Sequence, residues 1–145
     1  MGLTAEDKIE IHELCAKYYV STDEKDVDGF MDCWVEDDDI VFESAFGNFK
    51  GRNEIRNFED EHVSTGMAIG KRHLLGNVYV SESDNKKQAL VTSYLIVLEV
   101  VDKPFIVATA IYRDSVVEKT SKGWRFRKRS MEVDPGFQKV MGGHG

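Results

Sequence analysis

The segment QALVTSYLIVLEVV, from Gln88 to Val101, is one of four stretches in which apolar and polar side chains recur with a period of two. This alternation predicts β-strands that bury one face. The other three predicted strands are His73–Ser81, Phe105–Lys119 and Trp124–Val133. Because short runs of polar turn residues separate the four strands, the C-terminal half of the chain predicts a long-stranded antiparallel meander.

The N-terminal half of the chain shows a helical period instead. One apolar stripe recurs at i, i+3, i+4, i+7 and i+8, and it consists of Ile11, Leu14, Cys15, Tyr18 and Tyr19. This stripe predicts a helix from Thr4, which can cap it, to about Thr22. A short second helix is predicted after Asp26, and a third from an Asn53 cap to about His62.

Helices followed by a run of strands predict the α+β fold class. Long strands in a small sheet must curl, and a curled sheet with a helix across it encloses a concave interior. We therefore expect a single α+β domain over residues 1–135. Its N-terminal helices and a curved antiparallel sheet would enclose a pocket for a small, mostly apolar molecule. Residues 136–145 are expected to form a flexible C-terminal tail.

Composition narrows the classes of partner. The net charge of −7 disfavours binding to phosphate backbones, so no nucleic acid is expected. No apolar run is long enough to span a bilayer, and the N-terminus lacks a secretory pattern, so we expect a cytoplasmic protein without a membrane partner. Cys15 and Cys33 are interpreted as buried small hydrophobes. The histidines are too scattered for a ligand set, so neither a metal nor another cofactor is expected.

Asp23 and His73 are the residues most able to do chemistry. Asp23 ends the first helix and His73 begins the first long strand of the meander. Each alone is more typical of a cap or of a core position. Together they are more informative, because a carboxylate that binds one imidazole nitrogen leaves the other nitrogen as a general base. The spacing leaves their contact open. His12 and His62 are interpreted as ordinary polar helix positions.

Several short motifs occur in an order that resembles a known family. They are Ile11-His12-Glu13-Leu14, Tyr18-Tyr19, Asp23-Glu24-Lys25-Asp26, Phe30, Trp34, Gly47-Asn48-Phe49-Lys50-Gly51, Arg72-His73, Asn77, Ser93-Tyr94, Tyr112-Arg113-Asp114 and Gly123-Trp124-Arg125-Phe126. Spanning most of residues 5–133, they resemble SnoaL-like proteins of the nuclear transport factor 2-like superfamily. The resemblance implies a cone-shaped, curved antiparallel sheet whose helices enclose a pocket for a small apolar or polycyclic ligand.

Within that superfamily the chain is similar to scytalone dehydratases, bile acid 7α-dehydratases and a hexachlorocyclohexane dehydrochlorinase. The resemblance implies that His73 is the base, that Asp23 orients it, and that Tyr18 donates a hydrogen bond to the substrate. The second histidine of the scytalone dehydratases falls near Ala108, so that substrate is not expected. The implied function is a cofactor-independent, dehydratase-like lyase or isomerase that removes a proton from a small cyclic substrate. A polyketide cyclase, a non-catalytic ligand-binding protein and a scaffold subunit stay open as alternatives.

Strand parity and a rough alignment add substrate-binding candidates, namely Trp34, Phe49, Tyr94, Ile96, Ala108, Tyr112 and Arg129. For each of them ordinary core packing is the alternative, and for Arg129 a salt bridge at the surface or at an interface. The sheet face outside the cone would be unusual to leave in water, so a homodimer or homotrimer is expected.

Overall fold

The computed structural model describes residues 2–137 and contains three helices and six strands. The helices are α1 (Ala5–Asp23), α2 (Val27–Met31) and α3 (Gly51–Val63). The strands are β1 (Val41–Ser44), β2 (Gly47–Lys50), β3 (Lys71–Glu82), β4 (Gln88–Glu99), β5 (Phe105–Thr120) and β6 (Gly123–Val133). All four long strands begin and end within two residues of the sequence prediction, which is thereby confirmed.

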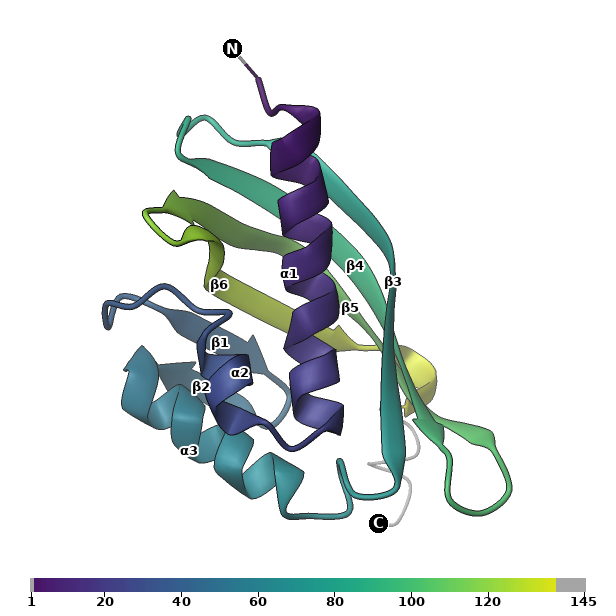
Figure 1. Ribbon diagram of the computed structural model, residues 1–145. Coiled ribbons are helices and arrows are strands. Elements are labelled where there is room, and N and C mark those ends of the chain that lie inside the picture. The colour runs from purple at the N-terminus through teal and green to yellow at the C-terminus, as the bar shows by residue number, and fades with distance from the viewer. Residues whose placement is uncertain (1, 138–145) are drawn as a thin grey trace.

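The strands form one sheet in the order β2-β1-β6-β5-β4-β3. The meander β3 to β6 is antiparallel as predicted, whereas β1 pairs with β6 in parallel. The predicted antiparallel sheet is thus confirmed for the other strand pairs, and the parallel β1–β6 pair is the exception. Helix α1 runs along one face of the sheet, while α2 and α3 lie beside β1 and β2 (Figure 1).

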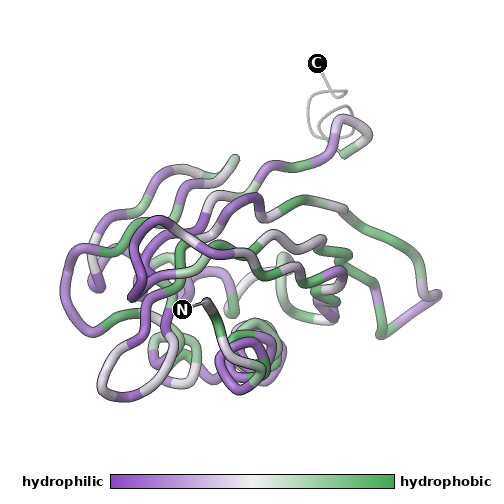
Figure 2. The backbone as a smooth tube through the Cα atoms, turned by 90° about the horizontal axis from the view of Figure 1, so that it is seen from above, coloured by the Kyte–Doolittle hydropathy of each residue, from purple (hydrophilic) through white to green (hydrophobic). Residues whose placement is uncertain are grey.

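The curvature of the sheet has local causes. The register of β3 against β4 shifts between Gly76 and Tyr79, and that of β5 against β6 shifts between Tyr112 and Val116. Such irregularities bend a strand and increase its twist. Asn77 lies inside the first shift and has a φ of 50°, in the left-handed region that asparagine tolerates better than most residues. Seen from above, the strands arch around α1 (Figure 2).

The first turn of α1 is hydrogen-bonded to strands β5 and β6. The Thr4 hydroxyl accepts a hydrogen bond from the Asp7 backbone N–H at 3.0 Å, and Asp7 Oδ2 accepts from the Thr4 N–H at 3.0 Å. This capping box confirms Thr4 as the N-cap. Asp7 Oδ1 also accepts hydrogen bonds from Trp124 and Lys119. The bond from the Thr4 backbone N–H, followed by the bond from Trp124, holds the pKa of Asp7 well below its ordinary value.

The start of α3 differs from the prediction. The helix begins at Gly51 instead of after an Asn53 cap, and its N-cap residue, Lys50, makes no side-chain cap bond. The Arg52 backbone N–H donates instead to Asp38 Oδ1 at 3.2 Å. The acceptor therefore comes from a distant loop, which a local sequence pattern cannot indicate.

The core lies between α1 and the concave face of the sheet. Ile11, Cys15, Phe126 and Val117 are almost completely buried there. Both cysteines are free and buried, as predicted. Within residues 2–137, none of the helices combines the length and the apolarity needed to cross a bilayer.

Candidate functional site

A cavity of about 230 Å³ opens between α1, α3 and the concave face of the sheet. Most of its lining is aromatic or aliphatic. The polar exceptions are Thr22, Glu59, His62, Lys71, His73, Thr109 and the tyrosines Tyr18, Tyr19 and Tyr112. For scale, an engineered apolar cavity of about 150 Å³ binds benzene. The size and lining therefore suit a ligand of one or two rings.

Asp23 and His73 meet at one wall of this cavity. His73 Nδ1 lies 2.8 Å from Asp23 Oδ1, and the His73 backbone N–H donates to Asp23 Oδ2 at 3.2 Å. Both carboxylate oxygens are thus used by one residue. Since an ionised carboxylate can only accept, a neutral His73 ring in this contact carries its proton on Nδ1 and has its lone pair on Nε2. The dyad has the arrangement of a general base with its orienting carboxylate.

Packing fixes the orientation of the imidazole as well. The Tyr19 ring stacks on His73 with an interplanar angle of 6° and a centroid distance of 4.8 Å. His73 is only 7% exposed, yet it lines the cavity. The hydroxyls of Tyr19 and Tyr112 share a hydrogen bond of 2.5 Å, and burial raises the pKa of both phenols. Both phenols are therefore neutral near pH 7, and because one donates to the other, the pair keeps one free O–H.

Tyr18 also lines the cavity, but its ring belongs to an aromatic cluster behind it. The ring packs against Phe30 at a centroid distance of 4.6 Å and against Phe126 at 5.4 Å. Burial raises the pKa of Tyr18 well above its ordinary value. The phenol is consequently uncharged, as a hydrogen-bond donor to substrate must be.

Of the predicted substrate-binding residues, Ala108 and Tyr112 line the cavity. Tyr94 and Ile96 do share one face of β4, as parity predicts, but the face that lines the cavity carries Leu95 and Val97. Tyr94 is 48% exposed on the outer side. Both faces of β4 carry apolar residues, so hydropathy could not tell which one turns inward.

Trp34, Phe49 and Arg129 lie outside the lining. Trp34 is buried beside Phe126. Phe49 packs on Phe42 and Phe58, one layer behind the cavity wall. The Arg129 guanidinium is completely buried and lies 3.8 Å from the centre of the Tyr112 ring and 4.1 Å from that of Phe126. A surface salt bridge, the alternative considered from the sequence, does not fit this interior cation–π position.

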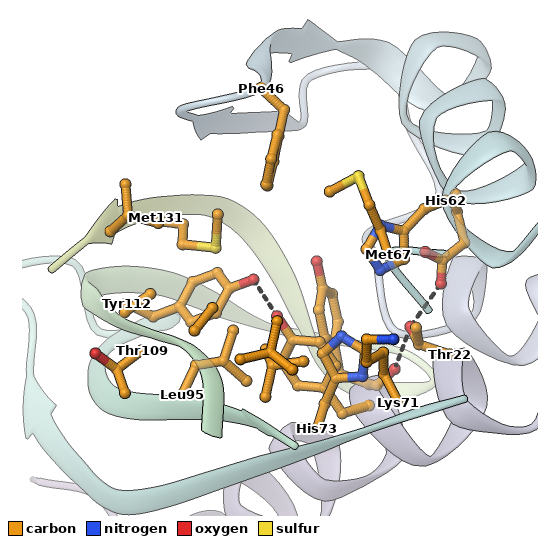
Figure 3. A pocket seen from close by; sticks show the side chains of 18 of the residues that line it. Thr22, Phe46, His62, Met67, Lys71, His73, Leu95, Thr109, Tyr112 and Met131 are labelled. Atoms are coloured by element: carbon orange, nitrogen blue, oxygen red, sulfur yellow. Dashed lines mark hydrogen bonds between the residues drawn. The ribbon is translucent and has the colours of Figure 1, made fainter. Parts of the chain in front are cut away.

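Two residues of α3 were missed by the sequence interpretation. Glu59 is 1% exposed, lines the cavity, and lies 2.6 Å from the Thr22 hydroxyl. Burial raises its pKa to about 7. His62 lines the same cavity, so describing it as an ordinary polar helix position was wrong. Figure 3 shows His62, Met67 and Phe46 on one side of the cavity and His73 and Leu95 on the other.

Burial lowers the pKa of His62 to about 4, so this imidazole is neutral at pH 7. Its ring centre lies 5.7 Å from that of His73. The sequence does contain a signal for Glu59 and His62. The positions Ile55, Phe58, Glu59, His62 and Val63 recur at i, i+3, i+4, i+7 and i+8. They form the inward stripe of α3, and two of them are ionisable.

Comparison with known proteins places the chain in a family. The model of the SnoaL-like domain matches residues 3–130. A protein of unknown function with a cystatin-like fold from Nostoc punctiforme is 32% identical, with a TM-score of 0.82 over 93% of this chain and 96% of that one. A nuclear transport factor 2-like protein from Novosphingobium aromaticivorans is 27% identical, with a TM-score of 0.78 over 90% of this chain and 84% of that one.

A third solved structure, also from Novosphingobium aromaticivorans, carries a provisional name as a scytalone dehydratase. It is 18% identical, with a TM-score of 0.72 over 88% of this chain and 83% of that one, and shows likeness of fold alone. Among curated proteins, none matches this chain.

The fold and cavity define the cystatin-like, nuclear transport factor 2-like class, in which a curved sheet and helices enclose a pocket. Within it, the chain belongs to the SnoaL-like domain family.

Proposed function

We propose that this protein is a cofactor-independent, dehydratase-like lyase or isomerase acting on a small, mostly apolar cyclic substrate. The observation that carries the proposal is the 2.8 Å contact between His73 Nδ1 and Asp23 at the wall of an apolar cavity. Held this way, Nε2 of His73 is a base without a proton of its own. Solved structures of this fold include proteins with provisional dehydratase names, which agrees with the proposal.

In the proposed reaction, Nε2 of His73 removes a proton from the carbon next to a carbonyl group. Asp23 stabilises the imidazolium that forms, because its negative charge lies against Nδ1–H. The hydrogen bond between Tyr19 and Tyr112 uses the proton of one of them, so the remaining O–H of that pair and the O–H of Tyr18 donate to the carbonyl oxygen as it gains negative charge. General base catalysis contributes about 10²–10⁴-fold, and the rest comes from orientation in the cavity.

The experiment follows exchange of α-carbon protons of a two-ring ketone, 2-tetralone, in D₂O by NMR, with wild-type protein and His73→Ala. We expect the wild type to accelerate exchange and His73→Ala to lose about 10²-fold or more of that acceleration. Binding of the ketone, followed by quenching of tryptophan fluorescence, should persist in the variant.

His12→Ala, which changes an exposed histidine of α1, is the matched control. Equal exchange by wild type and His73→Ala would contradict the proposal. Binding without any acceleration of exchange would instead support a ligand-binding protein that performs no chemistry.

A further inference from the structure

The cavity holds a second carboxyl group, Glu59, that the dyad does not use. Glu59 projects from α3, whereas His73 projects from β3. Both are anchored to the end of α1 by consecutive residues, since Thr22 contacts Glu59 and Asp23 contacts His73. One helix terminus therefore sets the positions of two groups that can carry protons.

The hydrogen bonds around Thr22 can accommodate either form of Glu59. The Thr22 hydroxyl lies 2.6 Å from Glu59 Oε2 and 3.3 Å from the Tyr18 carbonyl oxygen (Figure 3). A hydroxyl has one proton, and a carbonyl oxygen can only accept. The hydroxyl donates to Glu59 Oε2 when Glu59 is a carboxylate, and a protonated Glu59 can donate to the hydroxyl oxygen when Thr22 turns its proton to Tyr18.

The surroundings give Glu59 no cation to stabilise a carboxylate. Among residues 2–137, no lysine or arginine forms an ion pair with Glu59. Lys71 is the basic residue that reaches the cavity, and its Nζ pairs with Glu99 at 3.2 Å. His62 is neutral at pH 7. Burial in such surroundings favours the protonated form of a carboxyl group.

We propose that Glu59 is the general acid of the site, and that the substrate is a cyclic β-hydroxy ketone from which the protein eliminates water. This inference rests on the proposed function and narrows it, because an isomerisation or the loss of a stable anion needs no protonated leaving group. Hydroxide is a poor leaving group, and a neutral carboxylic acid beside it overcomes that difficulty.

The step balances without any further reactant. His73 Nε2 takes the α-proton, and the electron pair of that C–H bond becomes the new carbon–carbon double bond. The C–O bond to the hydroxyl breaks, and the Glu59 proton passes to the departing oxygen, so that water leaves. The site then holds the His73 imidazolium and the Glu59 carboxylate, and proton transfer through water restores the starting forms.

Glu59 can no longer donate a proton to the leaving group once it has ionised. Burial is the main cause that raises its pKa to about 7, the Thr22 hydrogen bond opposes this, and Asp60 and Asp23 raise it further. From α2, Asp28 is paired with Arg56 and adds little. The other titratable groups of α1, α3 and β3 that line the same cavity are Tyr18, Tyr19, His62, Lys71 and His73.

The experiment compares two substrates that give the same product. β-Hydroxycyclohexanone must lose hydroxide as water, whereas β-acetoxycyclohexanone loses acetate without prior protonation. Both give cyclohexenone, which is followed by its ultraviolet absorbance. We expect Glu59→Gln to lower kcat/KM about 10²-fold or more on the hydroxy ketone and less than about threefold on the acetoxy ketone. Glu61→Gln, at an exposed position of the same helix, should change neither rate.

Each other outcome has a distinct meaning. Equal losses on both substrates in Glu59→Gln would assign Glu59 a structural role and overturn the inference alone. If the wild type acts on the acetoxy ketone but not on the hydroxy ketone, the inference about Glu59 is overturned, while the role of His73 as the base still stands. If the wild type acts on neither ketone and also fails to exchange α-protons, the proposed function falls with it.

The wild type alone provides a second readout, should Glu59→Gln not fold. The ratio of kcat/KM for the hydroxy ketone to that for the acetoxy ketone cancels the contribution of the base, which both reactions need. We expect this ratio to fall about tenfold per pH unit above about 7, the pKa of Glu59. A ratio that stays flat between pH 6 and pH 9 would overturn the inference.

Discussion

The Asp23 carboxylate holds His73 at two points, through Oδ1 to ring Nδ1 and through Oδ2 to the backbone N–H. The second bond holds the carboxylate in place, because it ties Asp23 to the backbone of His73 near the start of β3. The orientation of the imidazole is therefore set by the pairing of a helix end with a strand. Rotation of the His73 side chain would break the bond to Nδ1 but leave the bond to the backbone N–H.

Asp23→Asn should impair catalysis more than binding. The amide offers one acceptor and one donor group in place of two acceptors, so it cannot serve both N–H groups of His73. We expect exchange of the α-protons of 2-tetralone to fall by about 10²–10⁴-fold, while the affinity for the ketone changes less than about threefold. Kinetics and fluorescence titration on the same samples test this. An unimpaired variant would show that the dyad is not catalytic.

Glu59→Gln should stabilise the fold at alkaline pH. The pKa of Glu59 is about 7 in the folded protein against an ordinary 4.5. The folded state thus binds the proton more tightly, and stability contributed by the protonated form declines as pH rises from about 4.5 to 7. Above pH 7 the buried carboxylate costs about 3 kcal/mol, which the neutral amide avoids.

Urea unfolding at pH 5 and pH 8.5 measures this effect, with Glu61→Gln as control. The free energy of unfolding should rise by about 2 kcal/mol or more in Glu59→Gln at pH 8.5 and change little at pH 5. The same change at both values would indicate that packing, and not ionisation, separates the variants.

His62 should make the protein sensitive to acid. Its pKa is about 4 in the folded state against an ordinary 6.5, because burial disfavours the charged ring. The unfolded chain therefore binds the proton first, and stability is lost as pH falls from about 6.5 to 4. His62→Phe keeps the ring stacked on Phe58 and removes the titration.

The measurement compares wild type and His62→Phe by denaturant unfolding at pH 7 and pH 4.5. We expect the wild type to lose roughly 2 kcal/mol more than the variant over that interval, and His12→Gln to behave as wild type. Parallel losses in all three proteins would contradict the assignment of acid sensitivity to His62.

The outer face of the sheet points to self-association. Leu74 and Tyr94 are each 48% exposed on neighbouring strands, and Leu74 is paired in register with Ile96. We propose that a second copy of the chain covers this face, in a dimer or trimer. Tyr94→Lys should shift the protein to monomer in light scattering after size-exclusion chromatography, without loss of helix content. A wild type that is already monomeric would contradict the proposal.

The sequence predicted the sheet well because alternation and turn residues are local signals. The boundaries of β4 and β5 follow from them to within two residues. The Asp23–His73 contact could not be derived in this way, since 50 residues separate the two. Only the resemblance to a family suggested it, and the geometry then brings the two side chains together.

Other parts of the site were out of reach for a physical reason. Tyr94 and Ile96 were chosen over Leu95 and Val97 because both faces of β4 are apolar. Glu59 was overlooked because a charged residue on a helix is usually exposed. Its burial depends on Thr22, a residue 37 positions away that accommodates the carboxyl group.

The central claim is that Asp23 keeps the Nε2 lone pair of His73 free to take a proton from a molecule in the cavity. Nitrogen-15 NMR of the histidine rings at pH 8 tests it most directly, with His73→Ala used to assign the signals. We expect the His73 ring to carry its proton on Nδ1 and none on Nε2. In Asp23→Asn, we expect the proton to be distributed between the two nitrogens. A His73 ring protonated at Nε2 in the wild type would contradict the account.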